Sequence, residues 1–215
     1  KSEPTKDALA LIIQDPQVVT ILRLGTRLAE ERMDVLDEDG KLTGEPIERF
    51  KLLGSQIYHR SVNVFLFRLR DGRAEVLLHK RSATKKAFPS AWDVAIAGGV
   101  SAGETFDTAA ERETTEEVGV GIPAVELIRL GPEEGHRIKE TKGGVKKVDG
   151  AGWYDTGYEH IGEHSVNQFR AVYFTVLPDG AETKLEAGEA TDAKWMPWDE
   201  ALADVLSKPL EYAGI

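Results

Sequence analysis

The first part of the chain carries apolar side chains at the spacing of amphipathic helices. Pro16 follows Asp15 and interrupts this pattern, so a short helix and then a longer one are expected. Residues 1–32 are therefore predicted to form a helical arm, either a packed pair of helices or an arm for dimerisation or for covering a site. The apolar positions at helical spacing include Leu9, Ile12, Ile13, Val18, Ile21, Leu22 and Leu28.

From Met33 onward the apolar period changes to that of β-strands. A first strand at residues 33–36 leads into Asp39-Gly40, and residues 62–67 run to Asp71-Gly72 before residues 74–78 return. An Asp-Gly pair between alternating apolar residues is a strong signal for a tight turn. Further elements are expected as strands at residues 124–130, 169–177 and 193–196 and a closing helix at residues 199–206.

One helix in this second part is marked at both ends. Thr105 is an N-cap candidate, a helix is expected from about Phe106 to Val118, and Gly119 is a typical stop signal. Residues 131–164 are rich in glycine and are expected to form a long loop or a mobile hairpin, which often carries function. The mixed order of strands and helices indicates an α+β fold or an α/β sandwich.

Composition limits the functions that this fold can have. The 215 residues are 41% hydrophobic and 30% charged, which suits one large domain with a packed core. Acidic residues outnumber basic ones by 37 to 27, and the formal charge of −10 disfavours a nucleic-acid duplex or an anionic membrane as partner. The absence of cysteine excludes disulfides, thiolate nucleophiles and cysteine-ligated zinc. No signal-peptide core and no apolar run of ~20 residues is present, so a cytoplasmic location is expected.

The segment from Gly98 to Val120 concentrates acidic residues on one face of the predicted helix. Glu113, Glu116 and Glu117 stand at i, i+3 and i+4, so their carboxylates share that face. Such crowding of like charges weakens a helix unless cations lie against it. Because Mg²⁺ and Mn²⁺ prefer oxygen ligands and are commonly shared with phosphates, the three carboxylates are expected to anchor metals that bridge a diphosphate.

Two neighbours extend this acidic face. Arg112 can hold a carboxylate in a bidentate fork, and Glu104, just before the helix, is a suitable partner for it. The Gly98-Gly99 pair lets backbone carbonyls approach a metal without interference from a Cβ atom. For a Glu-rich stretch by itself, a solvated acidic helix face is the alternative.

The whole segment resembles the Nudix box, which is Gly, five residues, Glu, seven residues, Arg-Glu, an apolar residue, any residue, Glu-Glu, any residue, Gly and an apolar residue. Thr114 stands where an aliphatic residue is usual, which costs packing and removes no ligand. Seven fixed residues match a given window by chance with a probability on the order of 10⁻⁸ to 10⁻⁹, so the signal is specific. The positions in register are Gly98, Glu104, Arg112, Glu113, Glu116, Glu117, Gly119 and Val120.

The resemblance implies an α/β/α sandwich with a mixed sheet, and an enzyme that hydrolyses a nucleoside diphosphate linked to another moiety with Mg²⁺, or alternatively Mn²⁺. By this likeness Glu116 and Glu117 are expected as direct metal ligands, joined by the carbonyl of Gly98 or of the glycine after it. Glu113 is expected as a ligand or as the base that deprotonates the attacking water, oriented by Arg112. A catalytically silent member that binds a nucleotide and regulates a partner is the alternative.

A wider likeness, over about residues 33–205, is to the branch of the Nudix family that contains isopentenyl-diphosphate isomerase. The isomerase needs a catalytic cysteine, which this chain lacks, and of its metal-binding histidines only His59 has an obvious counterpart. It also has paired glutamates in a late strand, where this chain has Val166-Asn167-Gln168. A hydrolase is therefore expected, with isomerase activity as the less favoured alternative. The likeness rests on residues 34–40, 59–62, 77–82 and 88–93.

Candidates for substrate binding also lie outside the box. Arg81 follows a predicted strand and is a candidate phosphate ligand, although surface arginines are common. A further metal-binding carboxylate is expected from Asp155, Glu159 or Glu163, among which the sequence does not choose. His164 is a candidate for proton transfer. The glycine-rich segment offers cations and rings suited to a phosphorylated substrate, or else solvated lysines and packed aromatics: Lys139, Lys142, Lys146, Lys147, Trp153, Tyr154 and Tyr158. Its histidines, His136, His160 and His164, are not spaced as a zinc site.

The sequence thus predicts two parts, a helical arm over residues 1–32 and a Nudix hydrolase domain over residues 33–215. The expected partner is a small phosphorylated molecule, with no nucleic-acid duplex and no membrane, and a homodimer is an open alternative. The box positions metals, whereas other loops choose the leaving group, so the substrate is left open by the sequence.

Overall fold

The computed structural model describes the chain from residue 31 onward in ten ranges. They are residues 31–52, 55–85, 88–119, 126–140, 145–148, 152–155, 167–178, 181–183, 190–208 and 211–213. For residues 138–140, 145–148 and 152–155 it describes the backbone alone. The helical arm predicted for residues 1–32 lies outside the described residues up to residue 30, and the first strand begins at Arg32.

Strands dominate the described part of the chain. They are β1 (Arg32–Met33), β2 (Ile47–Glu48), β3 (Tyr58–Arg70), β4 (Arg73–Arg81), β5 (Trp92–Val94), β6 (Ile96–Gly99), β7 (Ile128–Leu130), β8 (His136–Glu140), β9 (Val145–Val148), β10 (Gly152–Asp155), β11 (Asn167–Val176) and β12 (Ala190–Pro197). The helical elements are the 3-10 turn η1 (Arg49–Lys51) and the α-helices α3 (Phe106–Val118) and α4 (Trp198–Ser207).

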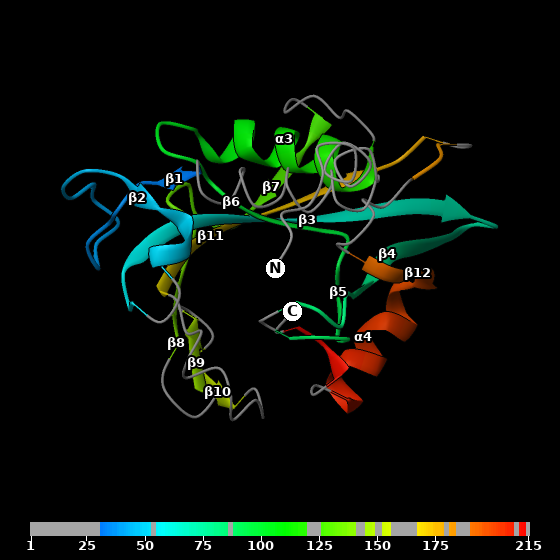
Figure 1. Cartoon of the computed structure of the whole chain (residues 1–215). Coiled ribbons are helices and arrows are strands. Elements are labelled where there is room, and N and C mark those ends of the chain that lie inside the picture. Colours follow the sequence, from blue (N-terminus) through cyan, green and yellow to red (C-terminus); the bar gives the residue numbers. More distant parts are fainter. Residues whose placement is uncertain are drawn as a thin grey trace, which may run out of the picture.

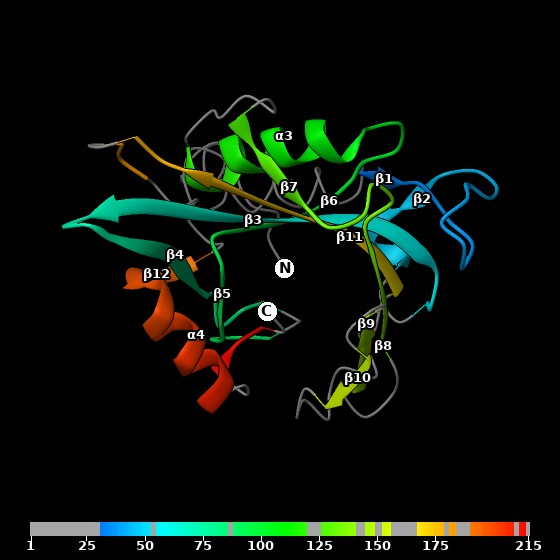
Figure 2. The same cartoon turned by 180° about the vertical axis from the view of Figure 1, so that it is seen from behind.

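The strands form one mixed sheet of ten and a separate pair, β1 with β2. The order in the large sheet is β10-β9-β8-β11-β3-β4-β12, with β5, β6 and β7 paired to β4, β3 and β11. β11 runs parallel to β3, from the pair Asn167↔Tyr58 to the pair Val176↔Phe67, and the other described pairings are antiparallel. Both views place α3 on one face of this sheet and α4 on the other (Figures 1 and 2).

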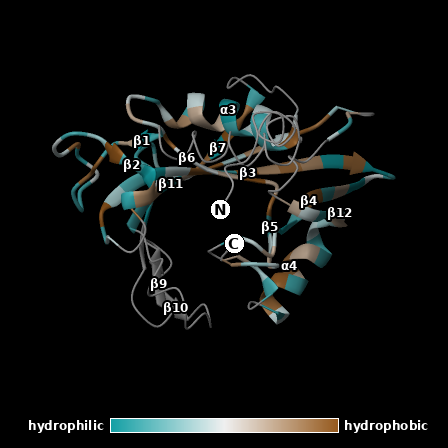
Figure 3. Cartoon of the chain, in the orientation of Figure 1, coloured by the Kyte–Doolittle hydropathy of each residue, from teal (hydrophilic) through white to brown (hydrophobic). Residues whose placement is uncertain are grey.

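Alternation along β3 sends its side chains to two different cores. Val62, Val64 and Leu66 have no exposed surface and share one core with Ala109 and Ala110 of α3. Hydrophobic residues follow β3 toward its β4 end, whereas hydrophilic residues gather near β1 and β2 (Figure 3). A helix thus covers each face, which confirms the predicted α/β/α sandwich within an α+β fold. The second core consists of Val76, Leu78, Ala201 and Tyr212, with Phe65 and Phe67 packed against it.

Local turn signals are confirmed where the structure describes them. Asp71 and Gly72 both have positive φ, 51° and 76°, as a type I′ turn requires, and they connect β3 to β4. Gly40 (φ 81°) lies in the other predicted turn, where Leu36 forms an isolated bridge with Leu42 instead of a longer hairpin. The strand expected at residues 33–36 is therefore wrong in length, since β1 ends at Met33.

For the glycine-rich segment, residues 131–164, the sequence left two alternatives, a long loop or a mobile hairpin. From His136 onward its described residues are not a loop, because β8, β9 and β10 pair with one another in antiparallel order and extend the sheet beyond β11. The sequence-based expectation of a hairpin is the alternative that fits. Of the helices in the described part of the chain, none has the length and apolarity needed to cross a lipid bilayer.

Candidate active site

Helix α3 is fixed at both ends by its own sequence. Thr105 is the N-cap, since its hydroxyl accepts from the Thr108 N–H at 3.2 Å and the Thr108 hydroxyl accepts from the Thr105 N–H at 3.1 Å. This reciprocal pair is a capping box. At the other end Gly119 adopts the left-handed conformation, with φ 68°, that ends a helix. The helix register, and with it the direction of each acidic side chain, is therefore set locally.

Arg112 is the centre of the site. Its guanidinium makes two hydrogen bonds to Glu104, from Nε at 2.8 Å and from Nη2 at 2.9 Å. Nη1 donates to Glu113 at 2.6 Å and to Glu116 at 3.3 Å, and Nη2 donates to the carbonyl of Gly99 at 2.9 Å. These bonds match the five N–H groups of a guanidinium in number. Arg112 therefore ties the helix, the preceding loop and strand β6 together, and the predicted Arg112–Glu104 fork is present.

The charges within this network shift its proton affinities. The hydrogen bond to Glu104 raises the pKa of Arg112, and the same bond lowers the pKa of the Glu104 carboxyl. Burial raises the pKa of Glu113, against the opposing effect of Arg112 and Arg49. Glu113 thus differs from Glu104 in kind, because its carboxylate has been taken out of water and favours proton uptake more strongly.

Glu113 reaches its place over strand β6 because residue 98 is glycine. The Glu113 side chain is buried, and a Cβ atom added to Gly98 would lie 2.0 Å from its Cδ and 2.2 Å from its Oε1. Side-chain atoms do not approach a Cβ that closely. Glycine at position 98 therefore leaves the space that the Glu113 side chain occupies. The sequence predicts a second use for this glycine, which is to let its backbone carbonyl approach a metal.

The three predicted carboxylates lie along the seam between α3 and β6, in different contacts. Glu113 and Glu116 meet at Nη1 of Arg112, whereas Glu117 accepts from the Ala97 N–H at 3.1 Å. Within the described residues, no three acidic or histidine side chains are grouped so that they could hold a metal ion in this arrangement. The donor set still fits a hard divalent cation in kind, since carboxylate oxygens of one helical turn face a glycine cradle beside β6.

Sequence reasoning missed two residues that belong to this region, Glu31 and Arg49. Arg49 Nη1 donates to Glu31 Oε2 at 2.8 Å, and the Glu31 side chain is only 9% exposed. Burial alone would lower the pKa of Arg49, but Glu31, Glu113 and Glu117 together raise it. No local pattern marks either residue, because Glu31 falls within the predicted arm and Arg49 within a short connection.

Buried polar side chains lie near the start of β3 and of β11. Gln168 Oε1 accepts from the Ser61 hydroxyl at 2.7 Å and from Arg170 Nη2 at 2.8 Å. Asn167 donates to the carbonyl of Gln56 at 2.7 Å. By the sequence resemblance, Asn167 and Gln168 are the amides set against the paired glutamates expected for the isomerase-like branch, and both are hydrogen-bonded here. Burial lowers the pKa of the neighbouring His59 to about 4.

The remaining predicted substrate residues are only partly placed. Arg81 Nη1 donates to the buried Asp93 at 2.8 Å, so this arginine already holds a carboxylate. Lys139 lies in β8, and Trp153 and Tyr154 lie in β10 opposite Lys147 and Lys146, with the backbone alone described. Asp155 ends β10 in the same way. The other candidates lie outside the described residues: Glu159, Glu163, Lys142, Tyr158, His160 and His164.

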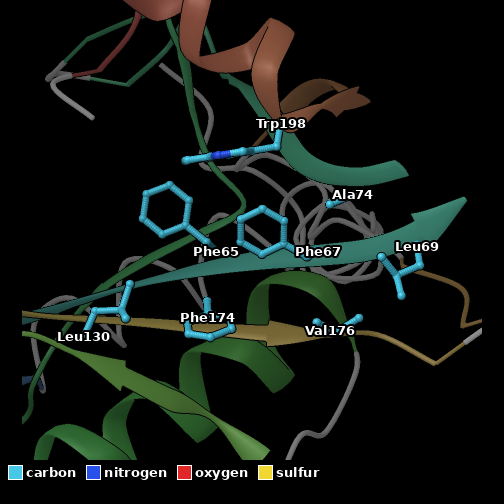
Figure 4. A pocket seen from close by; sticks show the side chains of 8 residues that line it. All are labelled: Phe65, Phe67, Leu69, Ala74, Leu130, Phe174, Val176 and Trp198. Carbon is cyan, nitrogen blue, oxygen red and sulfur yellow. The ribbon is translucent and has the colours of Figure 1, made fainter. Parts of the chain in front are cut away.

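The same sheet also carries an apolar groove of about 450 Å³. Its side chains come from β3, β4, β7 and β11 and from the first residue of α4, whose Trp198 ring lies across from the two phenylalanines of β3 (Figure 4). Its rim is open to solvent at Leu69, Val176 and Trp198. The lining residues are Phe65, Phe67, Leu69, Ala74, Leu130, Phe174, Val176 and Trp198.

Comparisons with known proteins concern the family and the fold. A family model described as the NUDIX domain matches residues 57–212. The chain is 40% identical over 96 residues to Nudix hydrolase 3 of Arabidopsis thaliana, which covers 45% of this chain and 12% of that protein. It is 38% identical over 101 residues to an uncharacterized Nudix hydrolase of Streptomyces coelicolor, covering 46% of this chain and 54% of that protein.

Two further comparisons concern the branch and the fold. An isopentenyl-diphosphate Delta-isomerase of Mycolicibacterium vanbaalenii is 33% identical over 92 residues, 43% of this chain and 49% of that protein. A crystal structure of a Deinococcus radiodurans protein superposes with a TM-score of 0.56 at 23% identity, over 82% of this chain and 90% of that one, and so supports the fold alone. The chain spans about half the length, or less, of these curated relatives.

Proposed function

This chain belongs to the Nudix family, and we propose that it is a pyrophosphohydrolase that uses Mg²⁺ to cleave a nucleoside diphosphate linked to another moiety. The observation that carries the proposal is the network around Arg112, which joins Glu104, Glu113, Glu116 and the Gly99 carbonyl through five hydrogen bonds. A network of this kind preorganises acidic side chains for a cation and a phosphate, which a solvated acidic helix does not need.

In the proposed reaction each acidic residue of the box has its own task. Glu116 and Glu117, with the carbonyl of Gly98, would hold the cation. Mg²⁺ supplies a Lewis acid that neutralises charge on the diphosphate oxygens. Glu113 is the group best suited to take a proton from the attacking water, since its buried carboxylate has a raised pKa. The new P–O bond forms from that water, and the bond to the bridging oxygen breaks.

Arg112 acts through the glutamates and is a positioning residue in this scheme. Its Nη1 orients Glu113, while its fork to Glu104 fixes the loop before α3. The bidentate geometry requires a planar guanidinium, which lysine cannot supply. Substitution of Arg112 is therefore expected to lower the rate of hydrolysis even though the side chain touches no reacting atom.

Isomerisation is disfavoured for two independent reasons. The chain contains no cysteine to shuttle an allylic proton, as the isomerase-like branch requires. In addition, Asn167 and Gln168 take up amide hydrogen bonds at the positions of the paired glutamates. Both differences remove acid–base groups and leave the acidic residues of the box unchanged.

A panel of diphosphate compounds tests the proposal. The chain would be incubated with NDP-sugars, ADP-ribose, dinucleoside polyphosphates, nucleoside triphosphates and nucleotide cofactors, with and without Mg²⁺, and monophosphate release would be followed by chromatography. At least one compound should be hydrolysed only with the cation, and Glu116→Gln should slow this at least about 100-fold. The matched control is Glu111→Gln, an exposed carboxylate of the same helix, which should keep the wild-type rate. Silence across the panel, or an unchanged Glu116→Gln rate, contradicts the proposal.

One observation favours a second candidate, a catalytically silent nucleotide-binding regulator. Among the described residues the acidic side chains of α3 are bound to Arg112 and to β6, and they do not form a group able to hold a metal as they stand. This candidate predicts that a nucleotide of the panel raises the melting temperature while its concentration stays constant over hours. Turnover of that nucleotide contradicts it.

A further inference from the structure

We propose that Glu31 supplies a fourth carboxylate to the divalent-cation site, in addition to the three of α3. The inference rests on the proposed function, because it concerns the cation that the hydrolase would use. It assigns a ligand from a part of the chain that lies far before the Nudix box in sequence and beside it in space.

The first observation is a buried oxygen without a partner. The Glu31 side chain is 9% exposed, and its Oε2 is paired with Arg49 at 2.8 Å. Its Oε1 is buried and has no hydrogen-bond partner among the residues that the structure describes. Leaving a buried acceptor unsatisfied costs roughly 1–3 kcal/mol, and more for a charged group, so native proteins rarely do so without a reason. A bound cation would give this carboxylate oxygen a partner.

The second observation is the position of that oxygen. A Cβ atom added to Gly99 would lie 3.5 Å from Glu31 Oε1. The carbonyl of the same Gly99 accepts from Arg112, the centre of the acidic network. Oε1 of Glu31 therefore lies beside the strand residue whose carbonyl Arg112 binds, and the two views show β1 next to β6 at one end of α3 (Figures 1 and 2).

The backbone holds Glu31 in this position at several points. Its carbonyl accepts from the Arg49 N–H at 2.9 Å, and the Arg32 carbonyl accepts from the Ala102 N–H at 2.7 Å. Met33 forms a bridge with Ser101 in the loop between β6 and α3. The backbone at Glu31 and at β1, which directly follows it, is thus attached both to η1 and to the loop before α3, so the starting point of the Glu31 side chain is fixed.

Arg49 links Glu31 electrostatically to the box. The charges of Glu31, Glu113 and Glu117 all act on its guanidinium in the same direction. Arg49 can therefore hold one oxygen of Glu31 while the other stays available, an arrangement in which a charged neighbour orients a metal ligand. The alternative is that Glu31 serves only as a structural counterion for Arg49, which would leave its second oxygen without a role.

Binding of Mn²⁺ to the full chain separates these two roles. The affinity would be measured by titration calorimetry and by the loss of the free-ion electron paramagnetic resonance signal, for wild type and Glu31→Gln. The amide keeps the size of the side chain and removes its charge, so the affinity should fall about 10-fold or more. The matched control is Glu45→Gln, an exposed carboxylate in the connection between β1 and β2, which should bind as wild type does.

Melting temperatures with and without Mn²⁺ provide the second readout. A ligand role predicts that Glu31→Gln gains less melting temperature than wild type from addition of the ion, whatever the loss of the Arg49 ion pair costs without it. A lower melting temperature without the ion, together with wild-type affinity, identifies a structural counterion and overturns the inference. Glu31→Asp keeps the charge on a shorter side chain and should recover part of the affinity, which keeps the test decisive if the Gln variant does not fold.

The outcomes also separate this inference from the proposed function. If Glu116→Gln weakens Mn²⁺ binding and Glu31→Gln does not, the site on α3 stands and the role of Glu31 is wrong. If wild type itself does not bind the ion, both proposals are contradicted.

Discussion

Glu113 can lie against strand β6 because the residue beneath it has no side chain. Its Cδ occupies the space that a Cβ atom of residue 98 would need, at 2.0 Å. Gly98 and Glu113 are separated by fifteen positions in sequence. The buried position of Glu113 requires a glycine at residue 98, and this requirement accounts for the glycine. At the scale of single residues, the site is therefore a matter of fit as much as of charge.

This fit predicts a strong coupling between the two positions. Gly98→Ala should destabilise the chain by roughly 1–3 kcal/mol, because the Glu113 side chain has to leave its place. In a Glu113→Ala background the same change should have almost no effect, since the overlapping atoms are gone. Urea unfolding of the four variants gives the coupling free energy. Equal losses in both backgrounds contradict the account.

His59 gives a prediction on pH at the same scale. Burial, with the nearby charges of Arg49 and Arg170, lowers its pKa to about 4, whereas an unfolded histidine titrates near about 6.5. As the pH falls between these values the unfolded chain takes up a proton that the folded chain refuses, so stability is lost, by up to roughly 3 kcal/mol. Urea midpoints between about pH 7 and pH 4.5 should therefore fall less in His59→Gln than in wild type. Identical pH profiles would show that His59 is not the group involved.

Helix α3 is the element that turns these residues into a site. The face that packs Ala109 and Ala110 into the core carries the acidic residues Glu113, Glu116 and Glu117 on its following turns. Thr114, the departure from the usual box, is fully buried, and its hydroxyl donates to the Ala110 carbonyl at 2.6 Å, so the helix itself satisfies this polar group. Because the caps fix both ends, a change at the first turn alters the whole acidic face.

The N-cap provides the prediction for this element. Thr105→Ala removes the hydrogen bond from the Thr108 N–H to the Thr105 hydroxyl and should lower the free energy of unfolding by about 1 kcal/mol. The same substitution at Thr115, exposed on the same helix, should raise it by a few tenths of a kcal/mol, because alanine has the higher helix propensity. Urea unfolding of both variants distinguishes them by sign. A loss of similar size at both positions would mean that the cap adds nothing.

At the scale of the whole molecule, short sequence signals predicted the turns and helix ends that depend on a few adjacent residues. The turn at Asp71-Gly72, the ends of α3 and the shared face of its glutamates follow from a few adjacent residues, and the structure has them. The parallel pairing of β3 with β11 joins residues more than a hundred positions apart, and no periodicity reports it. For the same reason Glu31 and Arg49 were missed, since only the pairing of β1 with β2 brings them to the site.

The apolar groove gives a prediction for the molecular surface. An open groove lined only by apolar side chains should bind an apolar dye such as anilinonaphthalene sulfonate in the folded state. Leu69→Lys and Val176→Lys, at the exposed rim, should reduce the fluorescence gain without loss of stability. Leu206→Lys, equally exposed on α4 but outside the groove, should leave it unchanged. Equal dye binding by all three variants would place the dye elsewhere.

The central claim is that water attacks a phosphoanhydride at a cation held by the glutamates of α3. The most direct measurement is hydrolysis of the best diphosphate substrate in ¹⁸O-water with Mg²⁺, followed by ³¹P NMR of the products. We expect the label in one phosphate group of the products, and a rate at least about 100-fold lower in Glu116→Gln. Products without label on phosphorus, or a rate that depends neither on Mg²⁺ nor on Glu116, would contradict the claim.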